Sequence, residues 1–248
     1  MPAYDFTGIR LFVEAALAAG AMVPLGKAQS HYLLQVMRLQ SGAEVLVFNG
    51  RDGEWRARLE PAGKKAAALA VAAQTRPQPP PNDLHYLFAP LKHARLDYMV
   101  EKAVEMGASR LQPVLTRHTQ VARVNLERMR ANAIEAAEQC GVLAVPEIGE
   151  PTPLSAAFAP DRLLIFCDER ADVADPMAAL AAAREAGPTP LAVLIGPEGG
   201  FSPEERAALL QWPRVVRLAL GPRILRADTA AVAALALVQA ALGDWRRE

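Results

Sequence analysis

Two glycine-marked loops near the C-terminus carry the residue types best suited to bind a ligand. Residues 196–201 read Gly-Pro-Glu-Gly-Gly-Phe and follow the apolar run of residues 191–195. Residues 221–229 read Gly-Pro-Arg-Ile-Leu-Arg-Ala-Asp-Thr and follow the apolar run of residues 215–220. Both runs are typical of buried strands, and open α/β sheets bind ligands at the carboxyl ends of their strands. The sequence therefore predicts a ligand site here, with ordinary strand–turn–helix corners as the alternative.

Helix-start signals define the geometry expected after the first loop. Ser202 suits an N-cap, Pro203 the first helical position, and Glu205 completes a capping box. The glycines let a ligand approach the backbone closely, so the loop is expected to point N–H groups at it. No Lys-Ser or Lys-Thr pair follows, and both Gly-x-Gly-x-x-Gly and Gly-x-Ser-x-Gly are absent. These patterns argue against a P-loop, a dinucleotide site and a serine hydrolase.

The remaining chemistry-bearing residues argue against metal, disulfide and membrane functions. The four histidines stand in no His-x-x-x-His or Cys/His pair, so no metal site is expected. Cys140 and Cys167 have no Cys-x-x-Cys spacing, and we interpret them as reduced thiols of a cytoplasmic protein. Apolar stretches end well short of the roughly 20 residues that a membrane span needs. The N-terminus shows no signal-peptide pattern.

Charge is balanced overall but unevenly distributed along the chain. The sequence has 27 Lys and Arg and 27 Asp and Glu. Residues 1–76 hold nine basic against six acidic side chains, and residues 85–130 hold eight against four. An ordinary solvated surface is the simplest interpretation of this modest asymmetry, and the alternative is a phosphate-facing surface built from the N-terminal part and residues 92–130. The candidate phosphate contacts on such a surface are Arg10, Arg38, Lys92, Lys102 and Arg117.

Composition divides the chain into two expected domains joined by a proline-rich linker at residues 75–82. Residues 1–74 read as a small β-rich domain, and residues 83–248 alternate between strand and helix patterns. In the first domain we expect strands at 43–49, 54–59 and 66–73, a hairpin turn at 50–53, and a helix at 31–37 capped by Ser30. In the second we expect strands at 84–89, 111–115, 162–167, 191–195 and 215–220, with helices at 94–106, 125–140, 175–185, from 203, and at 229–242. Such alternation predicts a largely parallel sheet covered on both faces.

Several segments resemble one known family. The two loops with their flanks, residues 194–202 and 220–230, resemble the signature of the bacterial 16S rRNA (uracil-N3)-methyltransferases, which belong to the SPOUT class. Residues 101–107, residues 135–141 and residues 31–42 resemble three further family segments, so the resemblance covers most of the chain. Asp228 stands where the family usually has Glu, and Val142 where Arg commonly follows the glycine.

The resemblance implies an architecture, a cofactor and partners. It implies an N-terminal PUA-like β-barrel and a C-terminal SPOUT α/β domain with a deep trefoil knot. It further implies S-adenosylmethionine as cofactor, a homodimer, and 16S rRNA of the 30S subunit as partner. The residues expected to line the cofactor slot are Leu194, Gly196, Pro197, Glu198, Gly199, Gly200, Leu220, Gly221, Ile224 and Leu225. Packing and tight turns are the alternative reason for these residue types.

The implied chemistry assigns roles to residues near the last helix. Uracil N3 carries a hydrogen, so the site needs a base or a cation that stabilises the developing anion. Arg226 and Asp228 stand two apart at the expected helix start, with Arg223 close by, and these three are the candidate catalytic residues. A structural Arg226–Asp228 pair that caps the helix is the alternative, and Glu198 is a weaker candidate. A ribose 2′-O-methyltransferase or another SPOUT enzyme, and a non-catalytic RNA-binding assembly factor, remain competing functions.

Overall fold

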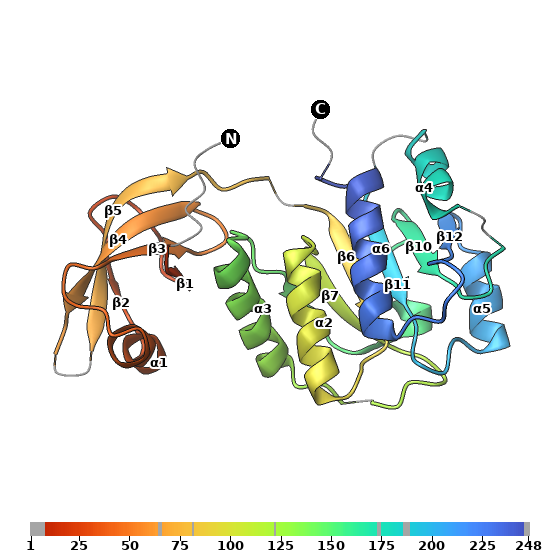
Figure 1. Ribbon diagram of the computed structural model, residues 1–248, viewed down its shortest axis with the longest axis horizontal. Coiled ribbons are helices and arrows are strands. Elements are labelled where there is room, and N and C mark those ends of the chain that lie inside the picture. Colours follow the sequence, from red (N-terminus) through yellow and green to blue (C-terminus); the bar gives the residue numbers. More distant parts are fainter. Residues whose placement is uncertain are drawn as a thin grey trace. The chain divides into compact units, whose positions relative to one another are not determined.

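The computed structural model describes residues 8–63, 66–80, 82–121, 123–172, 175–185 and 189–245. The chain divides into two compact units (Figure 1). The first comprises residues 1–80 and 137–145, and the second comprises residues 81–136 and 146–248. The first unit thus takes in a segment that lies far beyond the expected boundary at residue 74.

The first unit contains a curled five-stranded sheet with the order β1-β3-β4-β5-β2. Its strands are β1 (Arg10–Phe12), β2 (Met22–Pro24), β3 (Glu44–Phe48), β4 (Glu54–Pro61) and β5 (Ala67–Arg76). β3 and β4 form the predicted hairpin, and β5 extends two residues into the expected linker. The three-residue strands β1 and β2 were not predicted. Inward-facing side chains of the strands and of the helical segment form one apolar core.

The predicted helix at residues 31–37 is wrong in its start. The helix α1 (Lys27–His31) begins one turn earlier and continues as the π-helical turn η1 (Tyr32–Val36). The Gln29 side chain, rather than Ser30, caps the start by accepting a hydrogen bond from the backbone N–H of Gly26 at 3.2 Å. Ser30 is buried, and its hydroxyl accepts a hydrogen bond from the backbone N–H of Ala67 at 3.2 Å. Ser30 therefore joins the helix to the sheet.

A buried ion cluster corrects one expected RNA contact. Arg10 Nε donates to Glu54 Oε2 at 2.9 Å, and Arg76 Nη2 donates to the same oxygen at 2.6 Å. Burial alone would raise the pKa of Glu54, but hydrogen bonds, led by that from Arg76, outweigh it and lower the pKa. Arg76 also donates to the carbonyl of Gly141 at 3.0 Å, which ties that segment to the first unit. The prediction that Arg10 contacts RNA is wrong, because its side chain is only 3% exposed and is paired with Glu54.

The second unit is an α/β layer structure with a parallel sheet in the order β12-β10-β11-β6-β7-β8, which confirms the expected fold class. A short strand, β9, pairs with β7. The strands are β6 (Leu84–Phe88), β7 (Arg110–Leu115), β8 (Glu147–Ile148), β9 (Thr152–Pro153), β10 (Leu163–Cys167), β11 (Leu191–Ile195) and β12 (Val215–Leu218). The helices are α2 (His93–Glu105), α3 (Leu126–Cys140), η2 (Leu154–Ala156), α4 (Pro176–Glu185), α5 (Pro203–Leu210) and α6 (Ala227–Ala241).

Side chains cover both faces of this sheet. On one face, Ala192 and Leu194 of β11 pack in a core with Leu154 of η2, Phe201 of the loop after β11, and Leu209 of α5. On the other face α6 contacts β11, and α2 and α4 pack against α6 (Figure 1). This arrangement confirms a parallel sheet buried on both sides. The trefoil knot stays a prediction from the family resemblance.

Two helix boundaries matter for the site. In α2 the buried residues follow helical spacing, and Gly107, with φ +78°, ends the element as the sequence predicted. The last helix begins at Ala227 rather than Thr229, with Arg226 in extended conformation at its N-cap. Arg226 therefore stands at the end of the second loop and directly before the first helical turn.

Candidate active site

Three neighbouring strand ends build the main cavity of the second unit. β10 pairs with β11 on one side and with β12 on the other, all in parallel, so their carboxyl ends lie at one edge. The loops that follow them enclose a cavity of about 610 Å³. This volume is in the range of sites for small organic ligands. The lining residues are 167–169 from the end of β10, 195–201 from the end of β11, 218–227 from the end of β12, and Ala230 of α6.

The first glycine loop is shaped by close packing beneath the cavity. The backbone N–H of Gly200 donates to the carbonyl of Pro197 at 2.9 Å, which closes a tight turn, and Gly200 has φ +69°. A Cβ on Gly196 would lie 2.5 Å from Cε2 of Phe201. Phe201 is buried and packs edge-on against Phe166, with ring centroids 5.2 Å apart. Glycine at position 196 is thus required by the aromatic ring below the loop.

The helix start after this loop confirms the sequence prediction. Ser202 Oγ accepts a hydrogen bond from the backbone N–H of Glu205 at 3.2 Å. Glu205 Oε2 accepts one in return from the backbone N–H of Ser202 at 2.9 Å. Pro203 occupies the first turn. This capping box fixes the direction in which the chain leaves the cavity.

The second loop forms the cationic and most exposed wall of the cavity. Gly221 has φ +93°, and the chain then turns outward through Pro222 and Arg223. Ile224 is 98% exposed, although it is a large apolar residue that also lines the cavity. Arg223 and Arg226 are exposed and line the same cavity. This wall therefore offers positive charge and uncovered apolar surface side by side.

The third wall contains an acidic centre that the sequence analysis missed. Asp168 is only 2% exposed and accepts hydrogen bonds from Arg206 Nη2 and Arg217 Nη2, both at 2.9 Å. Burial alone would raise the pKa of Asp168, but hydrogen bonds from Arg206, the backbone of Arg170 and Arg217 outweigh it and lower the pKa. The signal for this residue was its place directly after a predicted strand. Its two partners lie 38 and 49 residues away, which no local pattern reveals.

Two buried groups near the cavity are neutral at physiological pH. Burial raises the pKa of the Cys167 thiol to about 12, so this cysteine is not a thiolate nucleophile. Burial, with smaller contributions from Cys167 and Asp228, raises the pKa of Tyr86 well above its ordinary value. The Tyr86 hydroxyl has no hydrogen-bond partner among the residues that the structure describes.

The structure brings nearly all predicted cofactor residues to this cavity. Nine of the ten line it, and so do Arg223 and Arg226 of the predicted catalytic set. Leu194 is the exception: it is fully buried in the sheet core, because its side chain points to the face covered by Phe201. Asp228 is not among the lining residues, and its Oδ1 accepts a hydrogen bond from the backbone N–H of Thr229 at 2.8 Å.

The remaining predicted RNA contacts lie on the surface with different partners. Arg38 is exposed and has φ +53°, which is uncommon for a residue other than glycine. Lys92 and Arg117 are exposed. Lys102 donates to Glu105 Oε1 at 2.6 Å and lies 5.5 Å from the centre of the Tyr98 ring. The hydrogen bond to Glu105 raises the pKa of Lys102.

Metal and membrane features are not seen in the part of the chain that the structure describes. Within those residues no three His, Cys, Asp or Glu side chains come together as a metal site. No helix among the described segments has the length and apolar content needed to cross a bilayer.

The fold and the cavity define a class: an α/β unit that binds an organic ligand at parallel strand ends, joined to a small β-rich unit. A model of the RNA methyltransferase domain matches residues 78–239, and a model of the RNA methyltransferase PUA domain matches residues 25–71. The chain belongs to this RNA methyltransferase family.

Relatives and solved structures agree with this assignment. The chain is 32% identical to ribosomal RNA small subunit methyltransferase E of Synechocystis over 240 residues, covering 94% of this chain and 78% of the relative. The Rickettsia conorii protein of the same name is 28% identical, with 93% and 94% covered. A methyltransferase of Legionella pneumophila, solved with bound cofactor SAM, has a TM-score of 0.83 and 28% identity, covering 96% of this chain and 99% of that one.

Proposed function

We propose that this protein transfers the methyl group of S-adenosylmethionine to N3 of a uridine in 16S rRNA of the small ribosomal subunit. The observation that carries the proposal is the cavity at the ends of β10, β11 and β12, lined by both glycine-marked loops. Relatives named ribosomal RNA small subunit methyltransferase E match almost the full chain, which supports the ribosomal substrate. The uridine and its N3 atom come from the motif resemblance.

The residues present fit S-adenosylmethionine. The cofactor has no phosphates, and the site accordingly offers glycine-marked backbone and aliphatic side chains rather than a P-loop. Glu169 at the cavity matches the cationic sulfonium and ammonium groups, while Arg223 matches the carboxylate. When bound, the cofactor supplies an activated methyl group on a sulfonium leaving group. The residues of this chain have to bind it and orient it.

Arg226 is the proposed electrostatic catalyst. Uracil gains negative charge as N3 loses its proton, and a fixed guanidinium at the cavity stabilises that charge. Arg226 lines the cavity directly before α6, whose N-terminus adds positive potential. Arg223, on the same loop, is the second candidate. Asp228 lies in the first turn of the helix and outside the cavity lining, so we propose that it supports the helix start.

RNA binding is proposed for exposed basic residues on both units. Arg38, Lys92 and Arg117 expose their side chains and would contact phosphates. Lys102 is a weaker contact, because its ammonium group is already paired with Glu105. Such contacts predict that rRNA affinity falls as salt rises.

Three further properties belong to this proposal. We propose a homodimer in which a second copy covers Ile224, because a large apolar side chain that is 98% exposed beside a cavity marks an interaction site. We propose the trefoil knot on the basis of the resemblance. We also propose a cytoplasmic location, since that is where small ribosomal subunits are found.

Nucleoside mass spectrometry of rRNA from a deletion strain tests the proposal. 3-Methyluridine should disappear from the 16S rRNA of that strain and return when the purified protein and S-adenosylmethionine are added. Loss of a ribose-methylated nucleoside instead would indicate the 2′-O alternative. Unchanged nucleosides, together with no cofactor binding, would indicate an assembly factor.

A further inference from the structure

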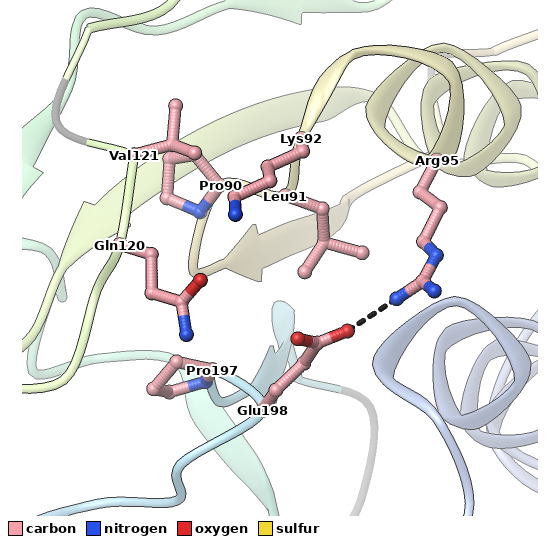
Figure 2. Close-up of a pocket in the computed structure, with 8 residues that line it drawn as sticks. All are labelled: Pro90, Leu91, Lys92, Arg95, Gln120, Val121, Pro197 and Glu198. Atoms are coloured by element: carbon pink, nitrogen blue, oxygen red, sulfur yellow. Dashed lines mark hydrogen bonds and ion pairs between the residues drawn. The ribbon is translucent and has the colours of Figure 1, made fainter.

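A second cavity, of about 300 Å³, borders the first glycine loop at Pro197 and Glu198 (Figure 2). It is lined by Pro90, Leu91, Lys92, Arg95, Gln120, Val121, Pro197 and Glu198. Pro197 and Glu198 line the larger cavity as well, so this one segment borders both spaces. Any ligand in the second cavity would meet the proposed cofactor at residues 197 and 198.

Three polar side chains from three segments surround the second cavity. Figure 2 shows the Lys92 amino group, the Gln120 amide and the Glu198 carboxylate around one open space. Arg95 of α2 holds the Glu198 carboxylate through an ion pair. The Glu198 side chain remains 46% exposed, so it can still reach a ligand.

Hydrogen bonds hold the Gln120 side of the cavity in place. Within the loop after β7, the backbone N–H of Thr116 donates to Thr119 Oγ1 at 2.8 Å. The backbone N–H of Arg117 donates to Glu205 Oε1 at 2.7 Å, and His118 Nδ1 lies 3.1 Å from the carbonyl oxygen of Gly200. The loop that carries Gln120 is therefore fastened to the glycine loop and to α5, so the wall exists before any ligand arrives.

The polar groups match the hydrogen-bonding edge of uracil. Uracil presents an acceptor at O2, a donor at N3–H and an acceptor at O4. Lys92 and the Gln120 amide nitrogen are donors, and an ionised Glu198 is an acceptor only. Cytosine would place the lone pair of its N3 against the carboxylate, which is unfavourable. Enzymes that modify a base commonly read its Watson–Crick edge in this way, with apolar side chains against the ring faces. Leu91, Val121 and Pro197 supply such apolar surface.

The direction of the chemistry favours a proton acceptor at the boundary between the two cavities. The N3–H bond and the nitrogen lone pair left after proton loss point the same way in the plane of the ring. The incoming methyl group must therefore approach from the side on which the proton leaves. A proton acceptor has to stand where the base cavity meets the cofactor cavity, and Glu198 lines both.

We propose that the second cavity receives the target uracil and that Glu198 accepts its N3 proton, held by Arg95. This inference rests on the proposed function. The proton passes from N3 to a Glu198 oxygen, and the N3 electron pair forms the bond to the methyl carbon. The sulfur–carbon bond breaks with its electron pair on sulfur, which gives neutral S-adenosylhomocysteine. Glu198 then returns its proton to water. Arg95 acts through Glu198 and is a positioning residue.

Single-turnover methyl transfer to 30S subunits from a deletion strain, at saturating cofactor, tests this proposal. Glu198→Gln should lower the rate by about 10²–10⁴-fold, the usual contribution of a general base. Its remaining rate should rise in proportion to hydroxide, because solvent must then take the proton, and Glu198→Asp should restore part of the rate. Arg95→Ala should lower the rate less, with rescue by Arg95→Lys. Gln120→Leu should slow the reaction, whereas the matched control Gln211→Leu, at an exposed position outside both cavities, should not.

Separate outcomes distinguish failure of this inference from failure of the proposed function. Calorimetric titration with S-adenosylmethionine and thermal melts should show folded variants whose cofactor affinity lies within a few-fold of the wild type. Near-normal rates for both Glu198→Gln and Gln120→Leu, with 3-methyluridine still formed by the wild type, would overturn the inference alone. Recovery of the Glu198→Gln rate at higher cofactor concentration would do the same, since Glu198 would then be a cofactor contact. If the wild-type protein transfers no methyl group to uridine, both this inference and the proposed function are refuted.

Discussion

Gly196→Ala tests whether the first glycine loop has the shape that the cavity needs. The added Cβ would lie 2.5 Å from Cε2, 2.9 Å from Cζ and 3.1 Å from Cδ2 of the Phe201 ring. These distances are too short for carbon atoms, and the ring is buried against Phe166. Either the ring or the loop must shift. Overpacking of this kind costs about 1–3 kcal/mol. At about 2–4 °C per kcal/mol for a chain of this size, the unfolding transition should fall by roughly 2–12 °C.

The assay combines calorimetric titration with thermal unfolding. The displaced loop should bind S-adenosylmethionine at least about tenfold more weakly, which corresponds to 1.4 kcal/mol. Phe201→Leu provides the internal control, because a smaller side chain leaves room for the new methyl group. In that background Gly196→Ala should be less destabilising by about 0.5–3 kcal/mol, the range of coupling between touching residues. Strictly additive effects, or wild-type stability and affinity for Gly196→Ala alone, would refute the packing argument.

Three other predictions follow from the remaining walls and the basic surface. Arg226→Ala should lower the single-turnover rate by on the order of 100-fold with a much smaller effect on cofactor affinity, and Arg226→Lys should rescue little. Arg38→Ala should weaken rRNA binding across salt concentrations and leave cofactor binding unchanged. The slope of log affinity against log salt concentration should become shallower by about one, because one phosphate contact is lost. Asp168→Asn should destabilise the second unit by about 1–3 kcal/mol, since Arg206 and Arg217 lose a charged partner.

The Asp168 prediction includes a pH dependence with a definite sign. Its pKa is lowered in the folded protein, so the stabilisation is present above the unfolded value of about 3.9 and is lost as pH falls through the folded value. Wild-type stability should therefore drop in acid more steeply than that of Asp168→Asn, as measured by urea unfolding across pH 2–6. Parallel curves of unfolding free energy against pH for the two proteins would contradict this assignment to Asp168. A normal rate for Arg226→Ala would indicate that Arg223 is the electrostatic catalyst instead. An unchanged salt dependence of rRNA affinity for Arg38→Ala would indicate that Arg38 does not contact RNA.

Local signals made the glycine loops predictable from sequence. Ser202, Pro203 and Glu205 define a helix start within four residues, and the capping box forms as expected. The alternation of strand and helix patterns likewise predicted the parallel sheet of the second unit. Both features depend on neighbours along the chain, so no tertiary information was required.

Features that depend on distant partners were missed or wrong. All five residues of β11 are buried, so the sequence offers no alternation that shows Leu194 facing the core. Arg10 is buried and paired with Glu54, which lies 44 residues away along the chain. Asp168 is held by two arginines from α5 and β12, and its place in the cavity wall follows from strand order. Gln120 belongs to no motif, and its relevance comes only from the three segments that meet at the second cavity.

The most direct test of the central claim is the position of a transferred methyl group. Purified protein, S-adenosylmethionine with a labelled methyl group, and 30S subunits from a deletion strain are combined, and the 16S rRNA is digested to nucleosides. We expect close to one labelled methyl per subunit, recovered as 3-methyluridine, and less label at a limiting cofactor concentration when Gly196→Ala weakens cofactor binding. Label in a ribose, in another base, or in no nucleoside would contradict it.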